Sequence, residues 1–206
     1  RSRFELFGYC FSPDDGSDLR RRVVAAFDHY VPIGNMTDRN AARAIHDDGI
    51  DILVDLKGYT RDGRPEILSY RRAPIQANYL GYPGSMGMDG IDYIVADPIV
   101  APMAHQGDYS ERIVHLPDCY QPNDRKRTIS EMPVTRADAG LPEDAFVFCS
   151  FNNSYKLNAT MFDVWMSLLR NVDGSVLWLL VPTATCRENL RREAAQRGVD
   201  PDRLVF

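Results

Sequence analysis

The sequence predicts an α/β protein made of two domains, and three patterns lead to this prediction. Short apolar runs alternate with amphipathic segments along the 206 residues, as expected when strands and helices alternate along a chain. Residues 50–56 (IDILVDL) form a nearly continuous apolar run and are expected to be a strand buried on both faces, as in a parallel sheet covered by helices. The alternation starts again after a polar, proline-containing segment at residues 126–143, which we interpret as an interdomain linker.

The first domain is predicted to span residues 1–125. Ser17 or Asp18 can cap its first helix, because their side-chain oxygens accept hydrogen bonds from amides of the first helical turn. Thr37 or Asp38 can cap a second helix in the same way. The strands of this domain are expected in the runs at residues 4–11, 29–33, 50–56, 75–80, 91–96 and 112–116, with a further short helix at residues 66–72.

The second domain is predicted to begin at residue 144 and to continue to residue 206. Its βα units are fewer than an open doubly wound sheet needs to cover both of its faces, and the first domain opens directly on a strand. We therefore expect both domains to be incomplete and the chain to be an internal fragment of a larger protein. Strands are expected at residues 145–151, 175–181 and 203–206, and helices at 160–172 and 185–197.

Composition argues against several classes of partner. The formal net charge of −5 leaves no excess positive charge for a nucleic-acid backbone, and no run of about 18 apolar residues predicts a membrane span. Without a signal-peptide pattern, the chain is expected to be cytoplasmic.

The cysteines and histidines lack metal-ligand spacing, so we expect neither disulfides nor a metal site. They are Cys10, Cys119, Cys149, Cys186, His29, His46, His105 and His115.

The stretch FCSFNNSYKLN, residues 148–158, begins as a strand and ends at the start of a helix, for which Asn158 is the expected N-cap. In open α/β sheets ligands bind outside the carboxyl ends of strands, where helix N-termini attract anions. Lys156 could neutralise a diphosphate there, while the amides of Asn152 and Asn153 and the ring and hydroxyl of Tyr155 could contact a nucleotide. An ordinary polar turn between strand and helix would explain the same residues.

The stretch LGYPGSMGMDG, residues 80–90, carries four glycines after another predicted strand. It contains neither a dinucleotide fingerprint nor a Walker loop. Pro83 occupies the place of the first glycine of G-x-S-x-G, which argues against Ser85 as a hydrolase nucleophile. The loop could either press backbone amides against a ligand or simply reverse the chain.

Six segments carry a recognisable pattern: GYTRDGRPEIL, RRAPIQANYLGYPGSMGMDGIDYIVAD, YSERIVHLP, SFNNSYKLN, SVLWLL and RLVF. In order and spacing, they resemble the catalytic region of the protein O-GlcNAc transferase family, especially its bacterial-type members. The resemblance implies a GT-B fold, in which two Rossmann-like domains enclose the active site between them. It also implies inverting, metal-independent transfer of GlcNAc from UDP-GlcNAc to Ser and Thr hydroxyls of acceptor proteins, with no cofactor.

By motif match, the resemblance also assigns site residues. Lys156 would be the catalytic residue that contacts the diphosphate and stabilises the leaving UDP. Donor-binding residues would be Asn152, Asn153, Tyr155, Leu80, Gly81 and Pro83, the last three of them against the sugar. The family commonly carries Gln at the position of Asn153, so the shorter amide here could alter that contact.

Other parts of the family's catalytic region lie outside this chain. The Asp-Phe-x-x-His-Pro segment with its catalytic Asp and His would precede the first residue, as would the tetratricopeptide repeats. We therefore expect these 206 residues alone to be inactive. Two alternatives stay open: a related transferase that uses GDP-fucose or UDP-glucose, and a non-catalytic binding module of the same fold.

Overall fold

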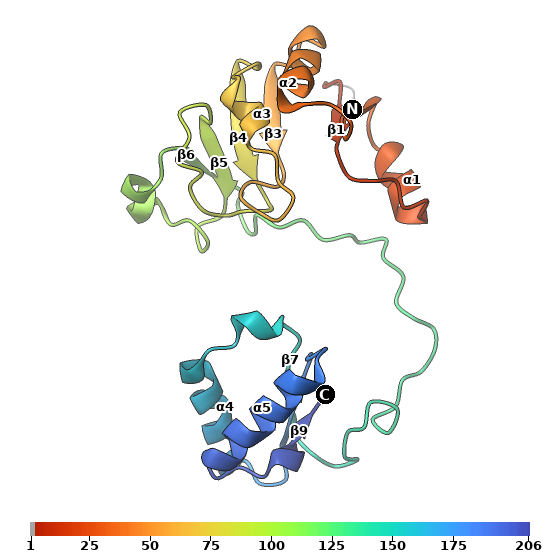
Figure 1. Ribbon diagram of the computed structural model, residues 1–206, viewed down its shortest axis with the longest axis vertical. Helices are drawn as coiled ribbons and strands as arrows, with labels where there is room; N and C mark the ends of the chain where they lie inside the picture. Colours follow the sequence, from red (N-terminus) through yellow and green to blue (C-terminus); the bar gives the residue numbers. More distant parts are fainter. Residues whose placement is uncertain (1–2) are drawn as a thin grey trace. The chain divides into compact units, whose positions relative to one another are not determined.

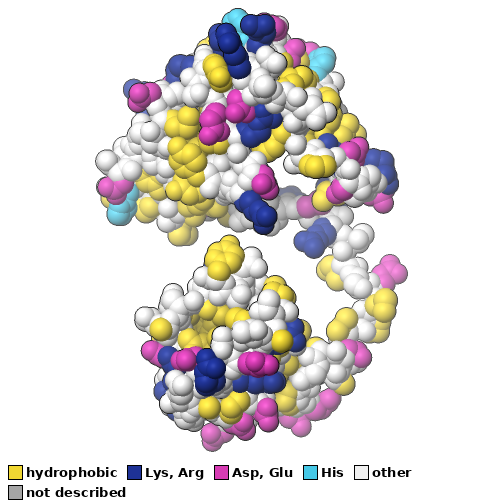
Figure 2. All heavy atoms as spheres, in the orientation of Figure 1, with side chains coloured by type: hydrophobic (Ala, Val, Ile, Leu, Met, Phe, Trp, Pro, Cys, Tyr) yellow, Lys and Arg dark blue, Asp and Glu magenta, His cyan; other side chains and the backbone are white. Residues whose placement is uncertain are grey.

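A computed structural model describes residues 3–206, and the chain divides into two compact units (Figure 1), one ending at Arg125 and the other comprising Lys126–Phe206. All strand pairs in both units are parallel. The predicted α/β class is therefore confirmed. Figure 2 shows acidic and basic side chains interspersed on the visible face of each unit. Nowhere between residues 3 and 206 is there a helix with the length and apolar character needed to cross a bilayer.

The first unit holds two parallel sheets. Strands β1 (Phe7–Cys10) and β2 (His29–Pro32) form one sheet. The other has the order β3-β4-β5-β6 and consists of β3 (Ile52–Asp55), β4 (Ile75–Tyr79), β5 (Tyr93–Ala96) and β6 (Arg112–His115). The helices are α1 (Asp18–Val24), α2 (Asp38–Asp47), α3 (Glu66–Ser69) and a 3-10 helix at Met103–Asp108 that the sequence did not predict.

Helix α2 organises the core of this unit. Thr37 caps it, as predicted, by accepting a hydrogen bond from the amide of Asn40 at 3.3 Å. Its small and branched residues Ala41, Ala42 and Ile45 are buried. They pack with side chains from β1, β2 and β3, so a single apolar cluster lies under both sheets.

The prediction that residues 50–56 are buried on both faces is wrong. Leu53 packs against the cluster under α2, but its neighbours Ile52 and Val54 are 54% and 43% exposed. Successive residues of a strand point to opposite faces, so one face of β3 is covered and the other is bare. The apolar run correctly predicted a strand. It could not predict which face of that strand would be covered by other residues among 3–206.

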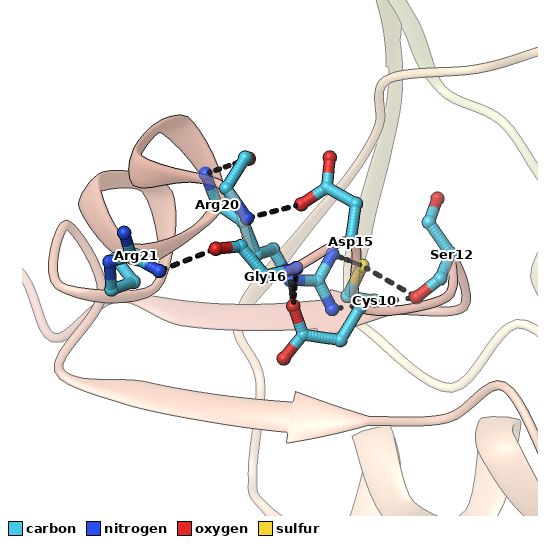
Figure 3. Close-up of polar contacts among 8 residues, drawn as sticks. Cys10, Ser12, Asp15, Gly16, Arg20 and Arg21 are labelled. Atoms are coloured by element: carbon cyan, nitrogen blue, oxygen red, sulfur yellow. Dashed lines mark hydrogen bonds and ion pairs between the residues drawn. The ribbon is translucent and has the colours of Figure 1, made fainter.

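Helix α1 lies on the opposite face of the β1–β2 sheet from α2. Its N-cap is Ser17, which accepts a hydrogen bond from the amide of Arg20 at 3.0 Å. The Arg20 guanidinium lies 3.2 Å from the Cys10 sulfur (Figure 3). The adjacent residue Tyr9 instead donates its hydroxyl to Asp48, the C-cap of α2, at 2.7 Å. Because Tyr9 and Cys10 point to opposite faces, α1 and α2 cover opposite faces.

The Cys10 thiol should ionise more readily than an ordinary cysteine. Burial by itself raises the pKa of this thiol, but the neighbouring Tyr30 hydroxyl and the hydrogen bond from Arg20 favour the thiolate, and the resulting pKa is below the ordinary value. Only the thiolate reacts with iodoacetamide. The pH at which the alkylation rate is half-maximal should therefore be lower for Cys10 than for a free cysteine, whose pKa is about 8.5. Mass spectrometry of the alkylated peptide against pH measures this midpoint. Arg20→Met should move it upward, and an unchanged midpoint would contradict the assignment to Arg20.

The second unit is a three-stranded sheet of order β7-β8-β9 with two long helices. The core lies between α4 and β8, where Phe162, Met166 and Leu169 meet Leu177 and Leu179. Residues 117–146, which span the junction of the units, contain no helix or strand. The elements are β7 (Val147–Ser150), β8 (Val176–Leu179), β9 (Leu204–Val205), α4 (Ala159–Asn171), α5 (Ala184–Gln196) and 3-10 helices at Ser154–Lys156 and Pro201–Arg203.

Candidate functional site

One candidate segment joins the carboxyl end of β7 to the start of α4. Asn152 and Asn153 come one residue after the end of the strand, beyond Phe151, and Tyr155 and Lys156 lie in the 3-10 helix that comes next. All four side chains are exposed, Tyr155 at 81%. The structure therefore brings the four predicted residues together on one accessible turn.

The N-terminus of α4 closes this segment. Asn158 has the extended backbone of an N-cap, and its side-chain oxygen accepts a hydrogen bond from the amide of Met161 at 2.9 Å, as predicted. The amides of a helix start and the helix dipole together favour an anion. Lys156 stands two residues before the cap, so a mobile ammonium group and a helix N-terminus are combined at one strand end.

The second candidate segment, residues 80–90, leaves the carboxyl end of β4 through a tight turn. Leu80 has a φ of 74°, and the amide of Gly81 donates to the carbonyl of Tyr79 at 3.0 Å. A three-residue turn of this geometry is rare and strained for a residue with a side chain. Gly81 itself lies against the backbone at residues 56–57, where a Cβ would come within 3.0 Å of the Lys57 Cα.

Two buried polar side chains hold this loop from behind. Asn78, on β4, donates its amide to the carbonyls of Tyr82 and Gly84 at 2.8 and 3.3 Å. Glu111, just before β6, accepts the amide of Met86 at 2.7 Å and the hydroxyl of Ser85 at 2.8 Å. Both side chains are fully buried. The loop is thus a fixed surface, and the Ser85 hydroxyl is engaged in structural bonding.

Leu80, Gly81 and Pro83 lie together in this loop, with Gly81 and Pro83 exposed and Leu80 half-buried. They belong to the first unit, whereas the segment after β7 belongs to the second.

Sequence reasoning missed Glu111 and Asn78, because a single acid or amide inside a strand-rich segment has no diagnostic spacing. Within residues 3–206, no group of His, Cys, Asp or Glu side chains is arranged to hold a metal ion.

Comparison with known proteins supports the family resemblance seen in the sequence. The family model described as glycosyl transferase family 41 matches residues 1–133 and 123–206. An Arabidopsis thaliana protein named as a probable UDP-N-acetylglucosamine-peptide N-acetylglucosaminyltransferase is 38% identical over the whole of this chain, and a Caenorhabditis elegans protein of that named activity is 26% identical. The chain spans only 22% and 28% of the length of these two relatives.

A solved structure of a mutant O-GlcNAc transferase from Thermobaculum terrenum matches 98% of this chain with a TM-score of 0.85 and 28% identity, over 38% of its own length. This match confirms the predicted α/β fold of GT-B type, and the family model confirms the resemblance seen in the sequence. The chain belongs to glycosyl transferase family 41.

Proposed function

We propose that the protein to which this chain belongs transfers GlcNAc from UDP-GlcNAc to Ser and Thr hydroxyls of acceptor proteins. The names of the relatives support the donor and the peptide acceptor. The observation that carries the proposal is the exposed Lys156 on the turn between β7 and the N-terminus of α4. Sugar transfer from a nucleotide donor leaves a diphosphate, and this turn presents positive charge for it.

In the proposed mechanism, the acceptor hydroxyl attacks the sugar carbon from the side opposite the leaving UDP, so the configuration inverts. Lys156 stabilises the negative charge that develops on the diphosphate, which is the part of the transition state that differs most from the substrate. The partial positive charge at the N-terminus of α4 would also stabilise this negative charge. We propose that this charge stabilisation is sufficient without a metal ion or another cofactor.

The loop after β4 would form the sugar side of the donor site. Its exposed backbone at Gly81 and Pro83, with Leu80 behind, is rigidly held and needs no reorganisation on binding. On the other unit, Asn152, Asn153 and Tyr155 would contact the nucleotide. We further propose, from the family resemblance, upstream tetratricopeptide repeats and a cytoplasmic location.

Removal of the Lys156 charge should weaken nucleotide binding. In the full-length protein, Lys156→Ala should reduce UDP affinity at least tenfold, because a charge-assisted hydrogen bond contributes about 1.5 to 3 kcal/mol. Isothermal titration calorimetry measures the affinity. Lys126→Ala, which removes the same charge outside the candidate turn, should leave it unchanged.

Three results would redirect the proposal. Equal UDP affinity in wild type and Lys156→Ala would remove Lys156 from the site. Tighter binding of GDP than of UDP would favour a fucose donor, and competition by UDP-glucose over UDP-GlcNAc would favour glucose. A folded protein that binds UDP without transferring sugar to any peptide acceptor would favour the non-catalytic module.

A further inference from the structure

A pocket lies between the two chain connections that follow strands β4 and β5. Its volume is about 510 Å³, which is within the range of ligand-binding pockets. Part of its lining is an apolar wall made of Ile99, Val100 and Pro102. The other lining residues are polar or aromatic, and they are Ser85, His105, Asp108 and Tyr109.

The apolar wall is held by buried groups beneath it. Asp97, which is 4% exposed, accepts hydrogen bonds from the amides of Ile99 and Val100, each at 2.9 Å. Ala101 is fully buried, and its carbonyl oxygen lies 2.7 Å from Nε2 of His115. The Ile99 side chain is nevertheless 86% exposed, beside the exposed side chain of Val100. Adjacent apolar side chains that a fixed turn presents to water favour a partner that covers them.

The polar part of the pocket is fixed as well. Ser85 donates its hydroxyl to the buried carboxylate of Glu111 at 2.8 Å. Gln106 donates its side-chain amide to the carbonyl of Glu111 at 2.8 Å, which ties the 3-10 helix to the segment before β6. His105 and Asp108 form an exposed pair with a separation of 3.0 Å. The pocket is therefore formed before any ligand binds, and it places polar groups beside an apolar wall.

The pocket adjoins the loop that is proposed to hold the sugar. Ser85 belongs to this loop and lies two residues after Pro83, so the Cα atoms of these residues are at most about 7 Å apart. Strands β4 and β5 are parallel neighbours, so Leu80 and Ile99 follow strand ends at the same edge of the sheet. An extended peptide advances about 3.3 Å per residue. A peptide residue a few positions from a hydroxyl at the sugar would therefore lie over the pocket.

We propose that this pocket binds an uncharged apolar side chain of the acceptor protein, about two to four residues from the Ser or Thr that receives the sugar. The inference rests on the proposed transferase function. Ile99 and Val100 would cover the apolar side chain. An acidic side chain would be disfavoured, because Asp108 lines the pocket and the carboxylate of Glu111 lies behind Ser85.

The shape of the pocket favours a peptide over a small metabolite. Sites for small ligands usually enclose most of the surface of the ligand. Here the side chains of Ile99, His105 and Asp108 are largely exposed, so the pocket is open to solvent. A peptide needs no such enclosure, because the residues on either side of the bound side chain make further contacts along the protein.

The affinity of the full-length protein for synthetic peptides tests the inference. The peptides contain one Ser and differ only in having Val or Glu at a single flanking position. Fluorescence anisotropy in the presence of UDP measures their affinity, and wild type should prefer Val at a position within the proposed range. Ile99→Lys should weaken binding of that Val peptide at least about fivefold and strengthen binding of the Glu peptide, because the substitution removes an apolar contact and adds a positive charge.

The affinity for UDP separates this inference from the proposed function. Ile99→Lys should bind UDP as tightly as wild type. The matched control is Ile129→Lys, at a position that is 91% exposed and does not line the pocket, and it should keep both the UDP affinity and the preference for Val. If wild type bound the peptides but transferred no sugar, the proposed function would fail, whereas a preference for Val that depends on Ile99 would still support the pocket.

Three results would overturn the inference. The first is an equal preference of wild type and Ile99→Lys at every flanking position of the peptide. The second is a parallel loss of UDP and peptide affinity in Ile99→Lys, which would show that Ile99 supports the donor site instead of contacting the peptide. The third is a changed sedimentation coefficient in Ile99→Lys with unchanged peptide binding, which would assign the pocket to a second copy of the protein.

Discussion

Replacing Gly81 by alanine should destabilise the loop at residues 80–90 by about 3 kcal/mol and abolish sugar transfer by the full-length protein. The new Cβ would overlap the carbonyl oxygen of Leu56 and come within 3.0 Å of the Lys57 Cα. These are backbone atoms, so no side-chain rotation can relieve the contact. Leu80 already occupies a strained conformation with a φ of 74°, so the turn has little freedom to adjust.

Hydrogen exchange over residues 80–90 and a transfer assay together measure this effect. Gly107→Ala is the matched control, because nothing lies within 4 Å of a Cβ at that position and its φ is not in the left-handed region. The control should keep wild-type exchange and activity. If Gly81→Ala also kept both, the loop would be softer than its contacts indicate, and its proposed role as a rigid sugar platform would have to be abandoned.

Replacing Glu111 by alanine should have the second large effect. The substitution leaves the buried amide of Met86 without an acceptor and frees the Ser85 hydroxyl, and an unpaired buried donor costs about 1 to 3 kcal/mol. The lost volume adds a cavity cost, because the site is fully buried. We expect faster exchange of the Met86 amide and at least a tenfold lower rate of transfer.

Glu111→Gln separates hydrogen bonding from charge. Its carbonyl can still accept the Met86 amide, and its amino group can donate to the Ser85 oxygen. Exchange in this variant should stay near the wild-type rate. If Gln were as damaging as Ala, the negative charge itself, and not the acceptor geometry, would be what the loop requires.

The local structure was largely predictable because its signals are local. Thr37 and Asn158 begin their helices as expected, since a side-chain oxygen at an N-cap needs only the amide three residues ahead. The candidate turn at Asn152–Lys156 was identified for a similar reason, because a strand followed by a helix start is recognisable within a dozen residues. The parallel pairing of the strands also followed from the alternation of strands and helices along the chain.

The misses concern relations between distant residues. The exposed face of β3 depends on what lies beside Val54 in space, which a run of apolar letters cannot report. Glu111 supports the loop from 25 residues away, and only the parallel pairing of strands brings it there. The positive φ of Leu80 is set by the tertiary contact of its neighbour Gly81, and leucine has no preference for it.

Asn78 and Glu111 support the loop at residues 80–90, so in protein engineering the loop and these two side chains should be exchanged together. A designer who exchanges this loop with that of a relative, to alter the sugar accepted, would also move the two buried side chains on which it rests. A graft of the loop alone would place foreign carbonyls and amides over the original Asn78 and Glu111. Under the proposed role of this loop in sugar binding, a change of donor would require exchange of the loop together with Asn78 and Glu111.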